Sequence, residues 1–216
     1  MSDSPRLRIT EIFHSIQGEG LNAGERTVFV RLTGCPLRCS YCDTEYAFKG
    51  GEWMHLPEVL ERVAAFDTNH VCVTGGEPLA QRECANLLSD LCDAGYQVSL
   101  ETAGALDVSV VDPRVVKVVD LKTPDSGEMD RNLYENLDNL NESDQVKFVI
   151  CGEEDYRWAA GQVGRYWLDR RCQVLFSPAA GRIAPRDLAE WILRDRLPVR
   201  LQLQLHKILW GDAPGR

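Results

Sequence analysis

The sequence predicts an α/β fold, an open partial (β/α) barrel of about six units built on a mostly parallel sheet. Short runs rich in Val, Ile and Leu alternate with segments of helical periodicity, which is the pattern of repeated strand and helix units. The 216 residues, 44% of them hydrophobic, suffice for one substantial core, so we expect a single domain over residues 1–216. Because about six units are too few to close an eight-unit barrel, we expect the sheet to stay open.

The expected strands share a high content of aliphatic residues and are 7–13 at an edge of the sheet, 27–33, 70–74, 97–101, 115–121, 145–150, 173–176 and 200–205. The expected helices have apolar residues at helical spacing and are 56–66, 81–94, 132–140, 153–168 and 185–194. The first of them has Pro57 in its first turn, where proline is tolerated. In such folds the reaction takes place beyond the carboxyl ends of the strands.

Composition excludes several classes of partner. The 24 Lys and Arg against 33 Asp and Glu give a net charge of -9, which would repel a nucleic acid backbone. No stretch approaches the roughly 20 apolar residues of a membrane helix, and the first residues have no apolar core of signal-peptide type. We therefore expect a cytoplasmic protein that binds neither nucleic acid nor a membrane.

Three of the eight cysteines lie within eight residues of one loop, directly after the predicted strand 27–33. Cys35, Cys39 and Cys42 follow a CxxxCxxC spacing, and three thiolates on one loop can bind three irons of a four-iron four-sulfur cluster. The fourth iron then stays open for a ligand that is not part of the protein. The loop therefore predicts a redox-active cluster that binds a small molecule.

Two other interpretations of these cysteines are a zinc site and structural thiols. Zinc needs a fourth close ligand, commonly from a second cysteine or histidine motif, and none is evident in the sequence. A loop marked by glycine and proline has no strand or helix period that would place three thiols in a core. The remaining cysteines are dispersed and are expected to be buried and inert: Cys72, Cys84, Cys92, Cys151 and Cys172.

The cysteine loop resembles that of the radical S-adenosylmethionine superfamily, and a second motif supports the resemblance. Thr74-Gly75-Gly76-Glu77-Pro78 ends a predicted strand and is similar to the GGEP segment of that superfamily. The resemblance implies that Gly75, Gly76 and Glu77 hold the methionine amino group of S-adenosylmethionine. It also implies that Glu101 and Lys122, which follow the next strands, line the nucleoside pocket. Without it these segments would be turns and solvated strand ends.

The N-terminal segment from Glu11 to Gly20, EIFHSIQGEG, resembles the signature of the 7-carboxy-7-deazaguanine synthase family. The resemblance to this family extends over essentially the whole chain. The resemblance implies a substrate site made by Gln17, Glu19, Arg31, Thr74 and His206, with Arg31 binding a carboxylate. It further implies that Thr44 binds Mg²⁺, a cation that prefers oxygen ligands. Taken alone, the glycine-rich segment would be a polar turn, His206 a surface histidine, and Thr44 a hydroxyl bonded to the loop backbone.

This resemblance implies a lyase of queuosine and deazapurine biosynthesis. Its reaction is the S-adenosylmethionine-dependent ring contraction of 6-carboxy-5,6,7,8-tetrahydropterin to 7-carboxy-7-deazaguanine, with loss of ammonia. The implied cofactors are the four-iron four-sulfur cluster, S-adenosylmethionine and Mg²⁺. The implied partners are a flavodoxin-type or other low-potential electron donor and a second copy of the chain in a homodimer. No side chain is assigned as an acid or base.

Two other functions remain open from the sequence. An activating enzyme for a glycyl radical protein would share the cysteine loop, but the Gln17, Arg31 and His206 set suits a substrate with a polar edge and a carboxylate. A non-catalytic iron–sulfur carrier or scaffold would not need the segment that begins at Gly75 to bind a nucleoside. Turnover of the pterin substrate distinguishes all three.

Overall fold

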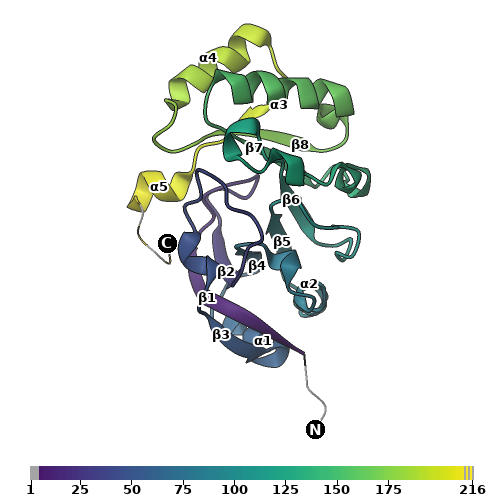
Figure 1. Cartoon of the computed structure of the whole chain (residues 1–216). Coiled ribbons are helices and arrows are strands. Elements are labelled where there is room, and N and C mark those ends of the chain that lie inside the picture. Colours follow the sequence, from purple (N-terminus) through teal and green to yellow (C-terminus); the bar gives the residue numbers. More distant parts are fainter. Residues whose placement is uncertain (1–4, 212, 214, 216) are drawn as a thin grey trace.

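A computed structural model describes residues 5–211, 213 and 215, which form an α/β fold around one open sheet (Figure 1). The sheet has the strand order β3-β1-β2-β4-β5-β6-β7-β8-β9. Its strands are β1 (Arg6–Ile16), β2 (Arg26–Leu32), β3 (Glu52–His55), β4 (His70–Gly75), β5 (Gln97–Thr102), β6 (Val116–Asp120), β7 (Gln145–Ile150), β8 (Gln173–Pro178) and β9 (Arg200–Leu201).

From β2 onward the neighbouring strands are parallel, whereas β1 pairs antiparallel with both β2 and β3. The two ends of the sheet, β3 and β9, do not pair with each other. The predicted open, mostly parallel partial barrel is therefore confirmed. Since parallel strands end at one edge, the carboxyl ends of β2 and of β4 to β7 meet there.

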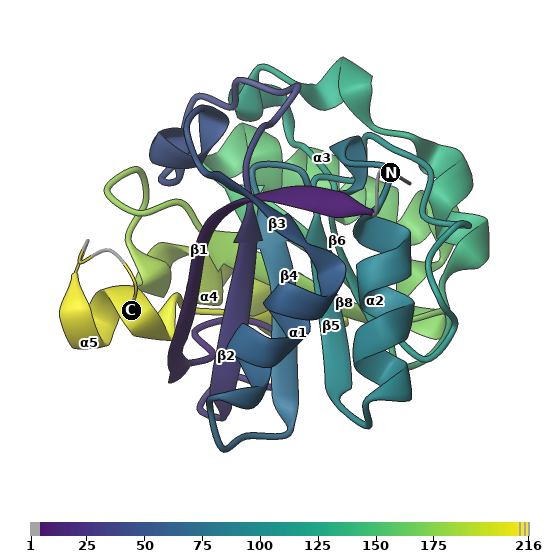
Figure 2. The same cartoon turned by 90° about the horizontal axis from the view of Figure 1, so that it is seen from below.

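Helices cover the outer face of the sheet (Figures 1 and 2). They are α1 (Leu56–Ala64), α2 (Cys84–Asp93), α3 (Glu153–Tyr166) and α4 (Pro185–Asp195), with a short α5 (Leu205–Trp210) at the end of the chain. Successive side chains of β2 point to opposite faces of the sheet. Val28 and Val30 join the buried core, whereas Phe29 and Arg31 face a cavity on the inner side. No helix in the described part of the chain is both long and apolar enough to cross a membrane.

Three predicted elements differ from the structure. The edge of the sheet is β3 rather than the segment 7–13, because β3 pairs with β1 outside it. The segment 132–140 contains a 3₁₀ helix (Tyr134–Asn139) instead of an α-helix. Its buried Asn136 accepts a hydrogen bond from the Val108 amide and donates one to the Leu106 carbonyl, and such side-chain bonds compete with helical ones.

The segment 200–205 has an alternating pattern that predicts one strand, but only Arg200 and Leu201 pair with β8. The Gln202 amide still donates to the Phe176 carbonyl of β8 at 2.9 Å, and its side-chain Oε1 accepts a hydrogen bond from the Gly20 amide at 2.7 Å. The backbone amide of Leu205 donates to the Gly18 carbonyl at 3.0 Å. The end of the chain is thus bound to the loop between β1 and β2, and α5 lies beside the carboxyl edge of the sheet (Figure 1).

Candidate active site

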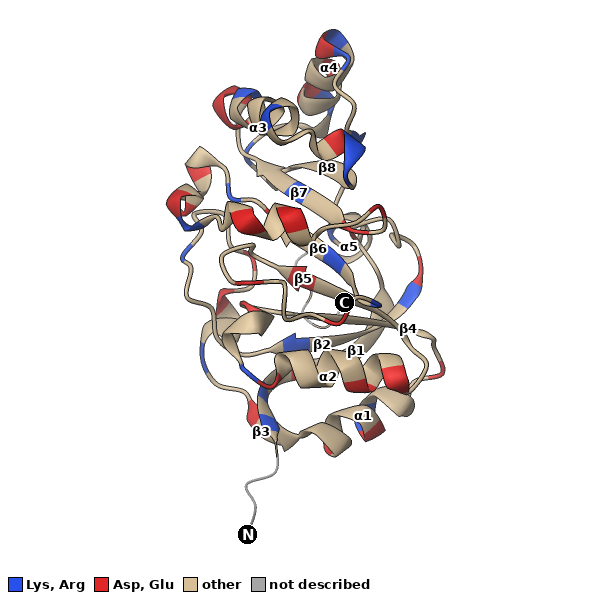
Figure 3. Ribbon diagram, turned by 90° about the vertical axis from the view of Figure 1, so that its right-hand side faces the viewer, with Lys and Arg blue, Asp and Glu red and all other residues tan. Residues whose placement is uncertain are grey.

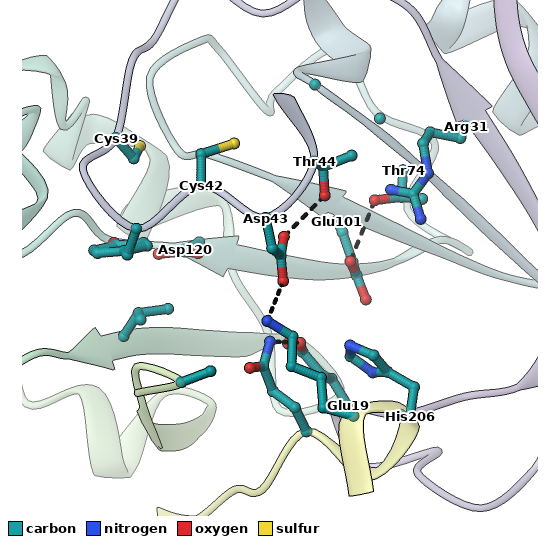
Figure 4. A pocket seen from close by; sticks show the side chains of 18 of the residues that line it. Glu19, Arg31, Cys39, Cys42, Asp43, Thr44, Thr74, Glu101, Asp120 and His206 are labelled. Carbon is teal, nitrogen blue, oxygen red and sulfur yellow. Dashed lines mark hydrogen bonds and ion pairs between the residues drawn. The ribbon is translucent and has the colours of Figure 1, made fainter. Parts of the chain in front are cut away.

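A cavity of about 820 Å³ lies at the carboxyl ends of the parallel strands, between the cysteine loop and α5 (Figure 4). Its walls include the predicted substrate residues Gln17, Glu19, Arg31, Thr74 and His206. They also include the residues predicted to bind the metal, cluster and cofactor: Cys35, Cys39, Cys42, Thr44, Gly75, Gly76, Glu101 and Lys122. Every predicted site residue except Glu77 therefore faces one cavity.

Backbone hydrogen bonds fix the cysteine loop above the strands. The amide of Gly34 donates to Ala47 at 2.7 Å, and the amide of Glu77 donates to the Gly34 carbonyl at 2.8 Å. Inside the loop, Arg38 Nη1 donates to the carbonyl oxygens of Cys35 and Leu37 at 2.8 and 2.6 Å. The loop is thus held by the end of β4 and by its own arginine.

The three thiols of the cysteine loop are not all as close to one another as the ligands of a single zinc ion would be. Tetrahedral sulfur ligands about 2.3 Å from zinc lie roughly 3.8 Å apart. Among the described residues, the one group of three or more metal-binding side chains whose ligand atoms all lie within 4.8 Å of one another is Asp125, Cys151 and Asp155. The cysteine loop does not form such a group. Its wider spacing fits a cluster in which each thiolate binds a different iron.

Gly75 and Gly76 let the end of β4 approach the end of β2 and the start of the cysteine loop closely. A Cβ on Gly75 would lie 2.5 Å from the Leu32 carbonyl oxygen, and one on Gly76 would collide with the Gly34 carbonyl oxygen and lie 2.7 Å from Cys35 Cβ. Neither glycine has a positive φ, so the reason is space and not backbone conformation. Gly75 thus makes room for the end of β2, and Gly76 makes room for the loop that carries the thiols.

Glu77 is fully buried, and its side chain lies outside the cavity. Its carboxylate accepts hydrogen bonds from the amides of Leu79 and Ala103 at 3.0 and 2.7 Å and from the Thr102 hydroxyl at 2.9 Å. These contacts join the ends of β4 and β5. The structure therefore gives Glu77 a structural contact that the sequence did not predict, and its contact with the cofactor stays a prediction.

Arg31 is held at the inner face of β2, opposite Thr74 of β4. Its Nε donates to Glu11 Oε1 at 2.7 Å, and the Tyr46 hydroxyl donates to the same oxygen at 2.8 Å. Among the described residues, no hydrogen bond engages the two terminal amino groups of Arg31. The guanidinium therefore keeps two adjacent donors for an anionic ligand.

Two buried carboxylates of the cavity have opposite electrostatic environments. Burial alone would raise the pKa of Glu19, but Lys147, 2.6 Å away, outweighs burial and brings that pKa below its ordinary value. Burial raises the pKa of Glu101, which accepts a hydrogen bond from the Thr74 hydroxyl at 3.2 Å. The pKa values of the two carboxylates are thus shifted in opposite directions, although Lys147 lowers both of them. Figure 3 shows a red segment on β5, the strand of Glu101, and a blue segment on β7, the strand of Lys147.

His206 of α5 lies against the loop between β1 and β2. A Cβ on Gly18 would collide with His206 Nδ1, so the glycine of the Gln17-Gly18-Glu19 segment makes room for this imidazole. Next to it, Lys207 Nζ lies 2.8 Å from Asp43 Oδ2, and Asp43 Oδ1 accepts a hydrogen bond from the Thr44 hydroxyl at 2.9 Å. This chain of contacts ties α5 to the cysteine loop across the cavity (Figure 4).

Residues 29–120 match the model of the radical SAM superfamily. The chain is 49% identical over 219 residues to the 7-carboxy-7-deazaguanine synthase of Chlorobaculum tepidum, covering 100% of both chains. It is 42% identical over 219 residues to the synthase of Koribacter versatilis, covering 94% of this chain and 97% of the relative. The chain belongs to the 7-carboxy-7-deazaguanine synthase family.

The fold agrees with this membership. The crystal structure of QueE from Escherichia coli matches 93% of this chain and 95% of its own chain with a TM-score of 0.77, at 23% sequence identity. The full-length similarity to 7-carboxy-7-deazaguanine synthases does not favour the glycyl radical activating enzyme, the alternative that the sequence left open.

Sequence motifs missed several polar residues of this synthase family member. Lys147 of β7 and Gln204 before α5 both contact Glu19, and Glu11 and Tyr46 hold Arg31. A lysine inside the otherwise apolar strand 145–150 was the one visible signal for Lys147. Of the other cysteines, Cys92 is half-buried and the rest are buried, and all are free thiols.

Proposed function

We propose that this chain catalyses the ring contraction of 6-carboxy-5,6,7,8-tetrahydropterin to 7-carboxy-7-deazaguanine, with loss of ammonia, as a step of deazapurine biosynthesis. The observation that carries the proposal is that one cavity contains both the three thiols and the polar set around Arg31 and Glu19. Full-length similarity to synthases of this name supports the same reaction.

The cofactor half of the cavity comprises the cysteine loop and the ends of β4 to β6. Cys35, Cys39 and Cys42 would bind the cluster. Gly76, Glu101 and Lys122 line the same cavity and would contact S-adenosylmethionine. When bound, these groups supply a carbon radical that takes a hydrogen atom from the substrate. The protein contributes position and exclusion of water, because α5 and the Lys207–Asp43 ion pair lie across the cavity.

The substrate half comprises β2 and the loop between β1 and β2. Arg31 presents two free donors that match a carboxylate, and the ionised Glu19 offers only acceptors, which suit the N–H groups of a pterin edge. Gln17 and His206 line the same region, and Thr74 lies beside Arg31. Together these residues would orient the reacting carbon towards the cofactor.

Anaerobic incubation of the reconstituted protein with the pterin, S-adenosylmethionine and a chemical reductant tests the proposed function. We expect 7-carboxy-7-deazaguanine and ammonia in equal amounts. Cleavage of S-adenosylmethionine that is never accompanied by this product would contradict the proposed reaction. It would leave the chain a radical generator for another substrate.

A low-potential electron donor, of flavodoxin type, is proposed to reduce the cluster in the cell.

We also propose a homodimer. The edge strand β9 and the helix α5 carry exposed apolar side chains, which supports burial of this region against a second copy: Leu201, Leu203, Ile208 and Leu209. Light scattering after size-exclusion chromatography measures the mass, and a monomer at all concentrations would contradict the dimer.

Replacing Arg31 with lysine is expected to lower product formation much more than cluster content. Lysine keeps the charge but lacks the planar pair of donors, so the substrate carboxylate would be held in the wrong orientation. Arg31→Ala should lower substrate efficiency at least about tenfold, since a hydrogen bond to a charged group contributes roughly 1.5 to 3 kcal/mol. Product and uncoupled deoxyadenosine are measured in the same sample.

The matched control for Arg31 is Arg62→Lys on α1, where the arginine is half-exposed and pairs with Glu58. This control should keep both product and coupling. If Arg31→Lys also retains wild-type, coupled turnover, then Arg31 is structural and another group holds the carboxylate.

Magnesium binding by Thr44 is proposed on the same basis. The Thr44 hydroxyl and Asp43 Oδ1 lie 2.9 Å apart at the cavity, and oxygen donors of this kind fit a hard cation that is shared with substrate oxygens. Thr44→Ala is expected to require more Mg²⁺ for half-maximal turnover, whereas Thr44→Ser should not. Turnover is measured against free Mg²⁺. Full wild-type activity after exhaustive chelation would remove the metal from the mechanism.

A further inference from the structure

Lys147 is a buried cation in the cavity wall that no sequence motif marks. It lies on β7, in register with Asp120 of β6, and its side chain is 11% exposed. Its Nζ lies 2.6 Å from Glu19 Oε2 and 3.8 Å from Asp120 Oδ2. A side chain of this kind is costly to bury unless its charge is paired, and here both partners are carboxylates of the cavity.

Lys147 and Gln204 together fix the orientation of Glu19. Lys147 binds Oε2, and Gln204 Nε2 donates to Oε1 at 2.8 Å, so both oxygens of the carboxylate are held from the protein side. A carboxylate has about four acceptor positions, so each oxygen keeps capacity for a ligand. Glu19 can therefore accept further hydrogen bonds without losing its orientation.

The charge of Lys147 also decides which hydrogen bonds Glu19 can make. Burial raises the pKa of Glu19, and the charge of Lys147, whose Nζ lies 2.6 Å from Oε2, is the largest cause that lowers it. Without Lys147 that opposing effect is lost, and burial favours the protonated form of Glu19. A protonated carboxyl would present a donor to the ligand, whereas the edge of a pterin that carries the amino group presents adjacent N–H donors and needs acceptors.

We propose that Lys147 is a positioning residue for substrate binding, which acts through Glu19 by keeping its carboxylate ionised and oriented for the amino edge of the pterin. This inference rests on the proposed function, because Lys147 would support the substrate site of that reaction. Asp120 anchors the lysine from the other side. Because Lys122 Nζ lies 3.0 Å from Asp120 Oδ2, Asp120 keeps a counter-ion when Lys147 is removed. Loss of Lys147 should therefore affect the substrate half of the cavity more than the cofactor half.

Lys147→Met tests this inference, because methionine keeps the length of the side chain and removes its charge. Binding is measured anaerobically on the protein with its cluster and without reductant, so that substrate and S-adenosylmethionine bind but do not react. The dissociation constant of 6-carboxytetrahydropterin is expected to rise about tenfold or more, and that of S-adenosylmethionine by less than about threefold. Under turnover, KM for the pterin should rise more than kcat falls.

A double variant shows whether Lys147 acts through Glu19. If it does, Glu19→Gln with Lys147→Met should bind the pterin no more weakly than Glu19→Gln alone, because both changes remove the same contact. Losses that add in the double variant would overturn the inference, and so would wild-type affinity of Lys147→Met. If Lys147→Met does not accumulate as folded protein, Lys147→Gln is measured against the same thresholds.

Lys117→Met is the matched control. Lys117 is another buried lysine, on β6, with Nζ 3.0 Å from Asp144 Oδ2, and it does not line the cavity. Its replacement should lower thermal stability but leave both dissociation constants unchanged. Wild-type turnover is measured in parallel, so the two proposals can fail separately. A wild-type protein that does not convert the pterin contradicts the proposed function, whereas conversion with unchanged KM in Lys147→Met contradicts only the role of Lys147.

Discussion

Replacement of Cys35, Cys39 or Cys42 by alanine is expected to abolish cleavage of S-adenosylmethionine. Each variant removes one ligand from the proposed site of three thiolates and an open iron, and among the described residues no other cysteine lines the cavity. Absorption and paramagnetic resonance after anaerobic reconstitution measure the cluster, and methionine release measures cleavage.

The control for the cysteine variants is Cys92→Ala. Cys92 is a half-buried free thiol on α2, outside the cavity, so its removal should leave the cluster and the cleavage rate unchanged. A variant of the cysteine loop that keeps a full cluster and wild-type cleavage would exclude that cysteine from the site.

Gly76→Ala is expected to cause the second large loss, although it removes no ligand. The new methyl group would meet the Gly34 carbonyl oxygen and Cys35 Cβ, and neither belongs to the free end of a flexible side chain. The cysteine loop would therefore have to move away from β4. We expect cluster content and cleavage to fall together, by about tenfold or more for cleavage, because a displacement near 1 Å in a catalytic site has such effects.

Gly161→Ala separates this effect from glycine replacement in general. Gly161 lies inside α3, and a Cβ there would meet nothing within 4 Å. Alanine should stabilise the helix by roughly 0.5 to 1 kcal/mol and leave the cluster intact. A Gly76→Ala protein with wild-type cluster content would show that the loop tolerates the methyl group, and that the glycine serves the ligand instead.

The central strands could be predicted because both of their faces are covered. β4 contains an apolar run, and β7 is apolar apart from Gln145 and Lys147; the structure places both strands within a residue of the expected ranges. β3 was missed because its four residues, Glu52–His55, contain one buried side chain and no clear alternation. In 200–205 the alternation was real, but hydrogen bonds to Gly18 and Gly20 end the strand after two residues.

In the site, too, the residues of local sequence motifs could be predicted, whereas those that depend on contacts between distant parts of the chain could not. Cysteine spacing and the glycines beside Glu77 are local, so the sequence predicts which residues gather at the cluster loop. Lys147 could not be assigned, because a single lysine in a strand commonly marks a solvated face. The role of Lys147 depends on its contact with Glu19, which lies 128 positions earlier in the sequence, in the loop between β1 and β2.

A crystal structure with S-adenosylmethionine and 6-carboxytetrahydropterin bound, grown anaerobically from reconstituted protein, tests the central claim most directly. We expect a cluster on Cys35, Cys39 and Cys42, with the substrate carboxylate on the terminal amino groups of Arg31 and the pterin edge on Glu19. Both ligands should lie in the one cavity. A fully occupied complex in which the pterin binds outside this cavity, or with its carboxylate away from Arg31, would contradict it.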